Sequence, residues 1–60
     1  MIIDSATRCV IQDEYPTFHM CRHVHGQLFE LLDANCVPIT LGYVSFDLLC
    51  QWRDKTKLIN

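Results

Sequence analysis

The sequence lacks any apolar run that approaches the roughly 20 residues needed to cross a bilayer. Its first residues, Met1-Ile2-Ile3-Asp4, contain no basic region and no long apolar stretch, so they do not have the pattern of a secretory signal peptide. We therefore expect a cytoplasmic protein with no membrane partner.

Basic residues are also few. Five Lys and Arg face seven Asp and Glu, which gives a net charge of −2. Proteins that follow a nucleic-acid backbone need a basic surface, so we do not expect a nucleic-acid partner. Arg53, Lys55 and Lys57 form the single basic cluster, and the dipole of a C-terminal helix explains their position.

Signatures of catalysis and of cofactor binding are missing as well. The two glycines, Gly26 and Gly42, stand alone, so there is no glycine-rich phosphate loop. No family signature surrounds any cysteine, and a chain of 60 residues has little room for a walled pocket. We expect no enzymatic activity, no catalytic residue and no cofactor.

The four cysteines include no C-x-x-C pair. They stand at Cys9, Cys21, Cys36 and Cys50. In a reducing compartment such residues behave as small hydrophobic side chains. We expect free and mostly buried thiols, with two disulfides as the alternative.

What the chain does contain is the composition of a globular protein, with 50% apolar and 20% charged residues. Its length allows one small domain, residues 1–60. Residues 6–12 hold a β-branched cluster that predicts a strand, and Pro16 predicts a turn over residues 13–17.

Residues 18–25 fit either a strand or a helix. On a strand, Phe18, Met20 and Val24 share one face, which we expect to be buried. On a helix, Phe18, Cys21, Val24 and Leu28 form an apolar stripe. Gly26 would weaken that helix, which favours a strand with Gly26 at a bulge or bend.

Two apolar runs, residues 28–32 and 36–41, flank Asp33-Ala34-Asn35. Aspartate initiates turns and asparagine tolerates the left-handed conformation, so this pattern predicts a β-hairpin that turns at residues 33–35. A helix over residues 27–34 is the alternative, since Leu and Glu favour helices.

A C-terminal helix is the clearest element. Ser45 is a good N-cap, and Phe46, Leu49 and Trp52 form one apolar face. The predicted fold is therefore α+β, in which a small antiparallel sheet of about three strands packs against one C-terminal helix.

The densest group of metal-ligating side chains is His19-x-Cys21-x-His23-x-His25. Imidazole and thiolate are the usual zinc ligands, so a small zinc-type module is one functional alternative. However, alternate residues of a strand are about 6.5 Å apart, so four donors in a line cannot all reach one ion. A solvent-exposed histidine face is the simpler interpretation.

A surface for binding a larger protein is the interpretation that we favour. Aromatic residues and methionine are enriched at interface cores. The candidate interaction residues are Tyr15, Phe18, Met20, Phe29 and Tyr43. A sheet edge and spare aromatic side chains also allow a homodimer.

Residues Cys21-Arg22-His23 and Glu30-Leu31-Leu32-Asp33 together resemble the C-x-H…E-L-x-D stretch of some Rof proteins. Members of the Rof family are small, acidic, Sm-like proteins that bind and inhibit the Rho termination factor. The resemblance implies, as a further alternative, a Rof-like inhibitor of transcription termination. It covers about thirteen residues, and a predicted helix stands where the family has further strands, so it assigns no site residue.

Overall fold

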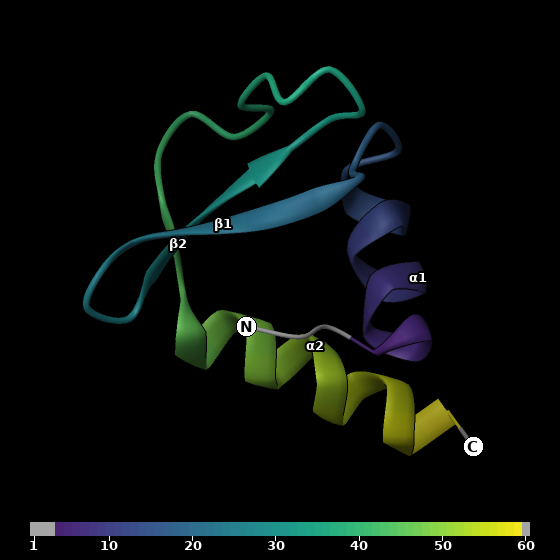
Figure 1. Cartoon of the computed structure of the whole chain (residues 1–60). Coiled ribbons are helices and arrows are strands. Elements are labelled where there is room, and N and C mark those ends of the chain that lie inside the picture. The colour runs from purple at the N-terminus through teal and green to yellow at the C-terminus, as the bar shows by residue number, and fades with distance from the viewer. Residues whose placement is uncertain (1–3, 60) are drawn as a thin grey trace.

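A computed structural model describes the backbone of residues 4–59 and the side chains of residues 4–56. The elements are α1 (Ser5–Glu14), β1 (Met20–His25), β2 (Leu28–Leu32), β3 (Val44–Ser45) and α2 (Phe46–Ile59). The strands form one antiparallel sheet in the order β1-β2-β3, and in Figure 1 α2 lies below the sheet and α1 lies to its right. The predicted α+β class, with a three-stranded sheet packed against the C-terminal helix, is confirmed.

Helix α1 replaces the strand that we predicted over residues 6–12. The Asp4 carboxylate accepts a hydrogen bond from the Thr7 backbone N–H at 2.8 Å and caps the helix. Thr7 and Ile11, four residues apart, are its buried positions. Tertiary packing of this face overrides the β-propensity of the sequence. The turn predicted at Pro16 is present, but it follows a helix: Tyr15 adopts φ −130° and ψ 82°, so α1 ends before Pro16.

Strands β1 and β2 form a hairpin through Gly26 and Gln27, since His25 pairs with Leu28. The strand prediction for residues 18–25 is confirmed, and the helical alternatives for this region are wrong. Gly26 has φ +54°, the sign that a two-residue hairpin turn needs at its first position. A bulge between His23 and His25 precedes the turn.

The chain reverses again close to the predicted turn at residues 33–35. The Cys36 N–H donates to the Asp33 carbonyl and the Asp33 N–H donates to the Val37 carbonyl, both at 3.0 Å. Asp33 and Val37 therefore enclose a three-residue loop, residues 34–36, and Cys36, with φ +62°, takes its left-handed position, which we had expected Asn35 to take. Of the apolar run over residues 36–41 that we predicted as the second hairpin strand, only Pro38 forms a bridge, to Leu32, and the chain then runs irregularly to β3.

The predicted helix after Ser45 is confirmed as α2. The Ser45 hydroxyl accepts a hydrogen bond from the Leu48 N–H at 3.1 Å, which is the geometry of an N-cap. Leu49 and Trp52 are buried, whereas Phe46 is partly exposed at 37%. The side chain of Lys57, which we placed in the last turn, lies outside the described residues.

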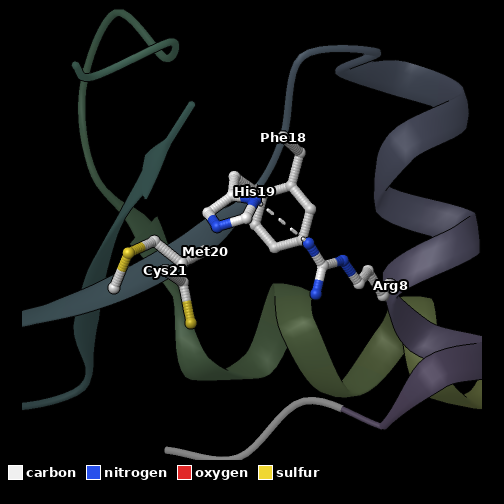
Figure 2. Close-up of a pocket in the computed structure, with 5 residues that line it drawn as sticks. All are labelled: Arg8, Phe18, His19, Met20 and Cys21. Atoms are coloured by element: carbon white, nitrogen blue, oxygen red, sulfur yellow. Dashed lines mark hydrogen bonds between the residues drawn. The ribbon is translucent and has the colours of Figure 1, made fainter. Parts of the chain in front are cut away.

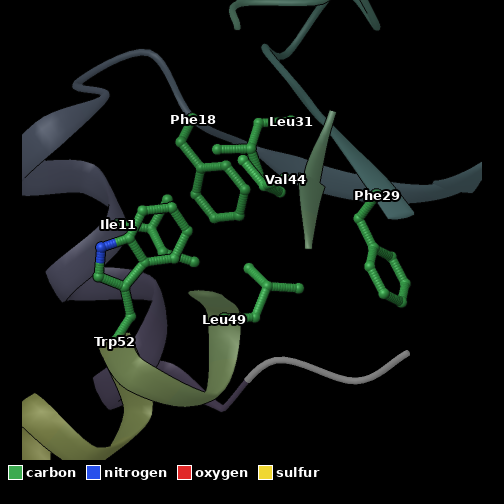
Figure 3. Packing of buried hydrophobic residues seen from close by; sticks show 7 residues of the cluster. All are labelled: Ile11, Phe18, Phe29, Leu31, Val44, Leu49 and Trp52. Atoms are coloured by element: carbon green, nitrogen blue, oxygen red, sulfur yellow. The ribbon is translucent and has the colours of Figure 1, made fainter. Parts of the chain in front are cut away.

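Side chains from both helices and from the sheet meet in one hydrophobic core, which Figure 3 shows. Its members are Ile11, Phe18, Phe29, Leu31, Val44, Leu49 and Trp52. The core lies between the helices and one face of the sheet, hereafter the inner face. The opposite face of the sheet, the outer face, carries no helix among the described residues.

The buried face of β1 is the opposite of the predicted one, apart from Phe18. Met20 and Val24 are exposed, whereas Cys21 packs against the core. Cys21 pairs with Leu31 and His23 pairs with Phe29, so β1 takes the register that the buried residues of β2 impose. Only one face of this sheet packs against the core, and the pairing of β1 with β2 determines which side chains of β1 lie on that face.

Candidate interaction surface

The outer face of the sheet presents apolar side chains to solvent. Alternation along the strands places Met20 and Leu28 on this face. Tyr43 precedes the buried Val44 of β3, so it also points to the outer face. Met20, Leu28 and Tyr43 are 43%, 39% and 58% exposed. A solvated sheet face normally carries polar residues, so this composition needs an explanation.

An ion pair crosses the same face. Arg22 of β1 and Glu30 of β2 are directly opposite in the register, and their side chains form a salt bridge. The Arg22 side chain is 61% exposed, whereas that of Glu30 is only 13% exposed. The pair therefore offers a fixed guanidinium with remaining donors among apolar neighbours.

The candidate interaction residues have three different environments. Met20 and Tyr43 are exposed on the outer face. Phe18 and Phe29 are buried members of the core. Tyr15 is half-buried, and its ring packs edge-on against Trp52, with 6.3 Å between ring centroids.

Sequence reasoning missed Leu28 and the Arg22–Glu30 pair as surface features. The signal for both was present in the alternation of residues 28–32. Phe29 and Leu31 alternate with Leu28 and Glu30, so only one of these two sets can face the core. We treated residues 28–32 as a uniformly apolar run, which hides that alternation.

The histidines and Cys21 of the predicted cluster have separate environments. The His19 ring lies beside Arg8, and His23 hydrogen-bonds the Gly26 carbonyl at 2.7 Å and packs edge-on against Phe29. The bulge before His25 interrupts the alternation that a shared face would require. In the part of the chain that the structure describes, no three His, Cys, Asp or Glu side chains are grouped to hold a metal ion.

All four cysteines are thiols in this structure. Cys9 and Cys36 are exposed, so the expectation of mostly buried thiols is wrong for these two, while Cys21 and Cys50 are half-buried. Partial burial raises the pKa of the Cys21 thiol, because it disfavours the charged thiolate. A raised thiol pKa is the opposite of what a nucleophilic cysteine requires.

In the basic C-terminal cluster, the side chains of Arg53 and Lys55 are exposed on α2. Arg53 pairs with Asp54, with 3.8 Å between Nε and Oδ1. Trp52 is buried, so it has no face on which a base can stack.

Two surface cavities accompany these features. One, of about 160 Å³, lies at the start of β1 and is lined by Arg8, Phe18, His19, Met20 and Cys21 (Figure 2). The other, of about 290 Å³, lies between the end of α1 and α2 and includes Tyr15 and Trp52 in its lining.

Neither described helix has the length and apolar character that a transmembrane segment needs. The Sm-like, strand-rich fold implied by the resemblance to the Rof family differs from the described arrangement, in which two helices flank a three-stranded sheet. A comparison of the chain with protein-family models, with curated proteins and with solved structures finds no match.

Proposed function

We propose that this chain is a non-enzymatic binding protein that docks on a larger protein through the outer face of its sheet. The observation that carries the proposal is the group of exposed apolar side chains on that face, Met20, Leu28 and Tyr43. Single exposed apolar residues are ordinary on protein surfaces, but a group of them on one uncovered face indicates a contact surface.

The chemistry of the face suits a protein partner. Tyrosine, methionine and arginine are enriched at protein interfaces, and Tyr43, Met20 and Arg22 occur together here. The exposed guanidinium of Arg22 can donate to carbonyl or carboxylate oxygens of the partner while Glu30 keeps it in place. Apolar contacts would then supply affinity, and Arg22 would supply orientation.

A role without catalysis agrees with the titratable groups that the structure describes. Cys21 is half-buried and its pKa is raised, so little thiolate forms near neutral pH. His19 and His23 make hydrogen bonds to Arg8 and to the Gly26 carbonyl, and neither of these partners is a nucleophile. Nothing in this group resembles a nucleophile held by a base.

Quantitative capture with paired variants tests the proposal. Leu28→Ser combined with Tyr43→Ser removes two of the apolar side chains without touching the core. Val37→Ser combined with Leu41→Ser is the matched control, because both residues are exposed but lie in the segment between β2 and β3. The tagged parent and both variants are used to capture proteins from cells that express the chain naturally.

We expect the outer-face variant to lose a captured protein at least about tenfold, the loss that 1.4 kcal/mol of binding free energy produces. The loop variant should retain that protein at the parental level. Equal capture by the parent and the outer-face variant would contradict the proposal, provided that circular dichroism shows both to be folded.

A further inference from the structure

The cavity at the start of β1 joins a cationic group to an apolar lining. Arg8 comes from α1, and the other lining residues, Phe18 to Cys21, come from the end of the α1–β1 connection and the first residues of β1. Figure 2 shows the guanidinium of Arg8 and the imidazole of His19 facing each other, with Met20 and Cys21 on the other side of the ring.

Two contacts hold the Arg8 guanidinium in place. Its central carbon lies 5.9 Å from the centroid of the Phe18 ring, in the arrangement of a cation–π contact. One of its terminal nitrogens, Nη2, lies 3.4 Å from His19 Nδ1. When Nδ1 accepts this hydrogen bond, the proton of a neutral His19 ring is on Nε2, which lies on the side of the ring away from Arg8 (Figure 2).

No carboxylate neutralises this pair within the described chain. The ion pairs found there join Arg22 to Glu30 and Arg53 to Asp54. Arg8 uses one of its five N–H donors for His19, so most of its planar fork remains unused. A fixed guanidinium with free parallel donors matches the geometry of a carboxylate.

The other residues that line the cavity indicate which chemical group can carry the carboxylate. Phe18 and Met20 are apolar, and burial raises the pKa of the Cys21 thiol, so Cys21 is a neutral neighbour near pH 7. A cavity of about 160 Å³ has room for a few methylene groups but not for a large ligand. This lining disfavours a bare inorganic ion, which has no apolar part to bury.

We propose that this cavity binds an alkyl carboxylate. The carboxylate lies against the free N–H donors of Arg8, and the hydrocarbon stem lies against Phe18 and Met20. A free short-chain carboxylic acid and the glutamate side chain of a bound protein share this chemistry. The site is independent of the proposed docking face except at Met20, so neither experiment substitutes Met20.

Titration of the labelled protein with sodium butyrate, followed by ¹H–¹⁵N correlation spectra, tests the proposal. We expect saturable shifts of the Arg8 Nε–H and the His19 amide signals, with a dissociation constant on the order of millimolar. Arg8→Gln should weaken binding at least about tenfold. Arg53→Gln, which removes an exposed arginine already paired with Asp54, should leave the affinity unchanged.

Three further ligands complete the experiment. Butyramide, the neutral analogue, should bind far more weakly than butyrate, and phosphate should bind no better than butyrate. Blocked glutamate, N-acetyl-glutamate N-methylamide, distinguishes the sources. Binding comparable to that of butyrate assigns the site to a protein side chain, and binding of butyrate alone assigns it to a free acid.

The proposal is overturned if butyrate gives no saturable shift at Arg8 and His19, if butyramide binds equally well, or if phosphate binds more tightly. Equal weakening by Arg8→Gln and Arg53→Gln would also overturn it, because it would reveal a general charge effect. None of these results bears on capture through Leu28 and Tyr43, so the two proposals fail separately.

Discussion

At the scale of single residues, Trp52 joins α1 and α2 to the common core. It comes from α2, packs against Tyr15 at the end of α1, and lies in the core with Ile11 and Leu49. It is 3% exposed. The sequence predicted this role correctly, because Trp52 falls on the apolar face that Leu49 also occupies.

Trp52→Ala should therefore remove most of the stability of the domain. Truncation of a buried large aromatic residue costs about 3–5 kcal/mol, which is comparable to the whole stability of a domain of this size. Urea unfolding followed by circular dichroism measures the effect. Gln51→Ala, at an exposed position on the same helix, is the control and should leave the unfolding midpoint nearly unchanged. Similar midpoints for the two variants would show that Trp52 is not a core residue.

Cys36 is the described non-glycine residue with a positive φ, at +62°. An L-residue in the left-handed region costs about 1–2 kcal/mol, and glycine avoids that cost. Cys36→Gly should raise the free energy of unfolding by up to about 1 kcal/mol, after allowance for the greater freedom of glycine in the unfolded chain. Cys36→Ala removes the thiol but keeps the strain, so it separates the two effects. A glycine variant no more stable than the alanine variant would contradict the assigned backbone conformation.

At the scale of elements, the sequence predicted β1, β2 and α2 because each carries its own local signal. The Ser45 cap and the Leu49–Trp52 spacing identify α2, and Gly26 separates β1 from β2. The strand predicted over residues 6–12 is wrong because the β-branched residues there were weighed without Asp4. The Asp4 cap and the four-residue spacing of the buried Thr7 and Ile11 together indicate a helix. That spacing stabilises a helix only when α2 covers the face that it forms, and the sequence of residues 4–14 alone does not show this packing.

The two faces of the sheet were harder to predict than the strands. Strand alternation places Phe18, Met20 and Val24 on one face, which we expected to be buried, and of the three only Phe18 is buried. The chain instead turns Cys21 inward at the start of β1, so Met20 becomes a surface residue. The exposure of Leu28 and the outward position of Met20 therefore could not be predicted from sequence alone, because the assignment of faces depends on the pairing of β1 with β2.

The cap of α1 gives a prediction for pH. The hydrogen bond from the Thr7 backbone N–H lowers the pKa of the Asp4 carboxyl below its ordinary value of 3.8. A lowered carboxyl pKa stabilises the folded chain above the pKa of the unfolded state, and this contribution is lost as the pH falls through the folded-state pKa. Stability should therefore decrease more steeply below pH 4 in the parent than in Asp4→Asn.

The same position separates charge from capping at neutral pH. Asp4→Asn keeps a side-chain oxygen that can accept from Thr7, whereas Asp4→Ala removes it. Thermal melting at pH 7 should show a lower midpoint for the alanine variant than for the asparagine variant. Equal midpoints for all three proteins would mean that the hydrogen bond does not stabilise α1.

At the scale of the whole molecule, the arrangement is one layer of helices on one face of a small sheet (Figure 1). A chain of 60 residues buries only about 60% of the surface that its unfolded form exposes. Apolar side chains outside the core therefore still have surface that contact with a partner could remove from water. Leu28 and Tyr43 lie on the face without a helix, where a partner would cover them. We therefore claim that a partner protein binds on the outer face of the sheet.

Site-specific photocrosslinking in living cells tests that claim most directly. The photoreactive residue benzoylphenylalanine replaces Tyr43 on the outer face or, as the control, Asp13 on the exposed side of α1. We expect position 43, but not position 13, to give a discrete crosslinked product heavier than twice the 7.0 kDa of the chain. A product of twice 7.0 kDa would assign the face to a homodimer. Absence of a product from position 43, or the same product from both positions, would contradict the claim that the outer face docks on a larger protein.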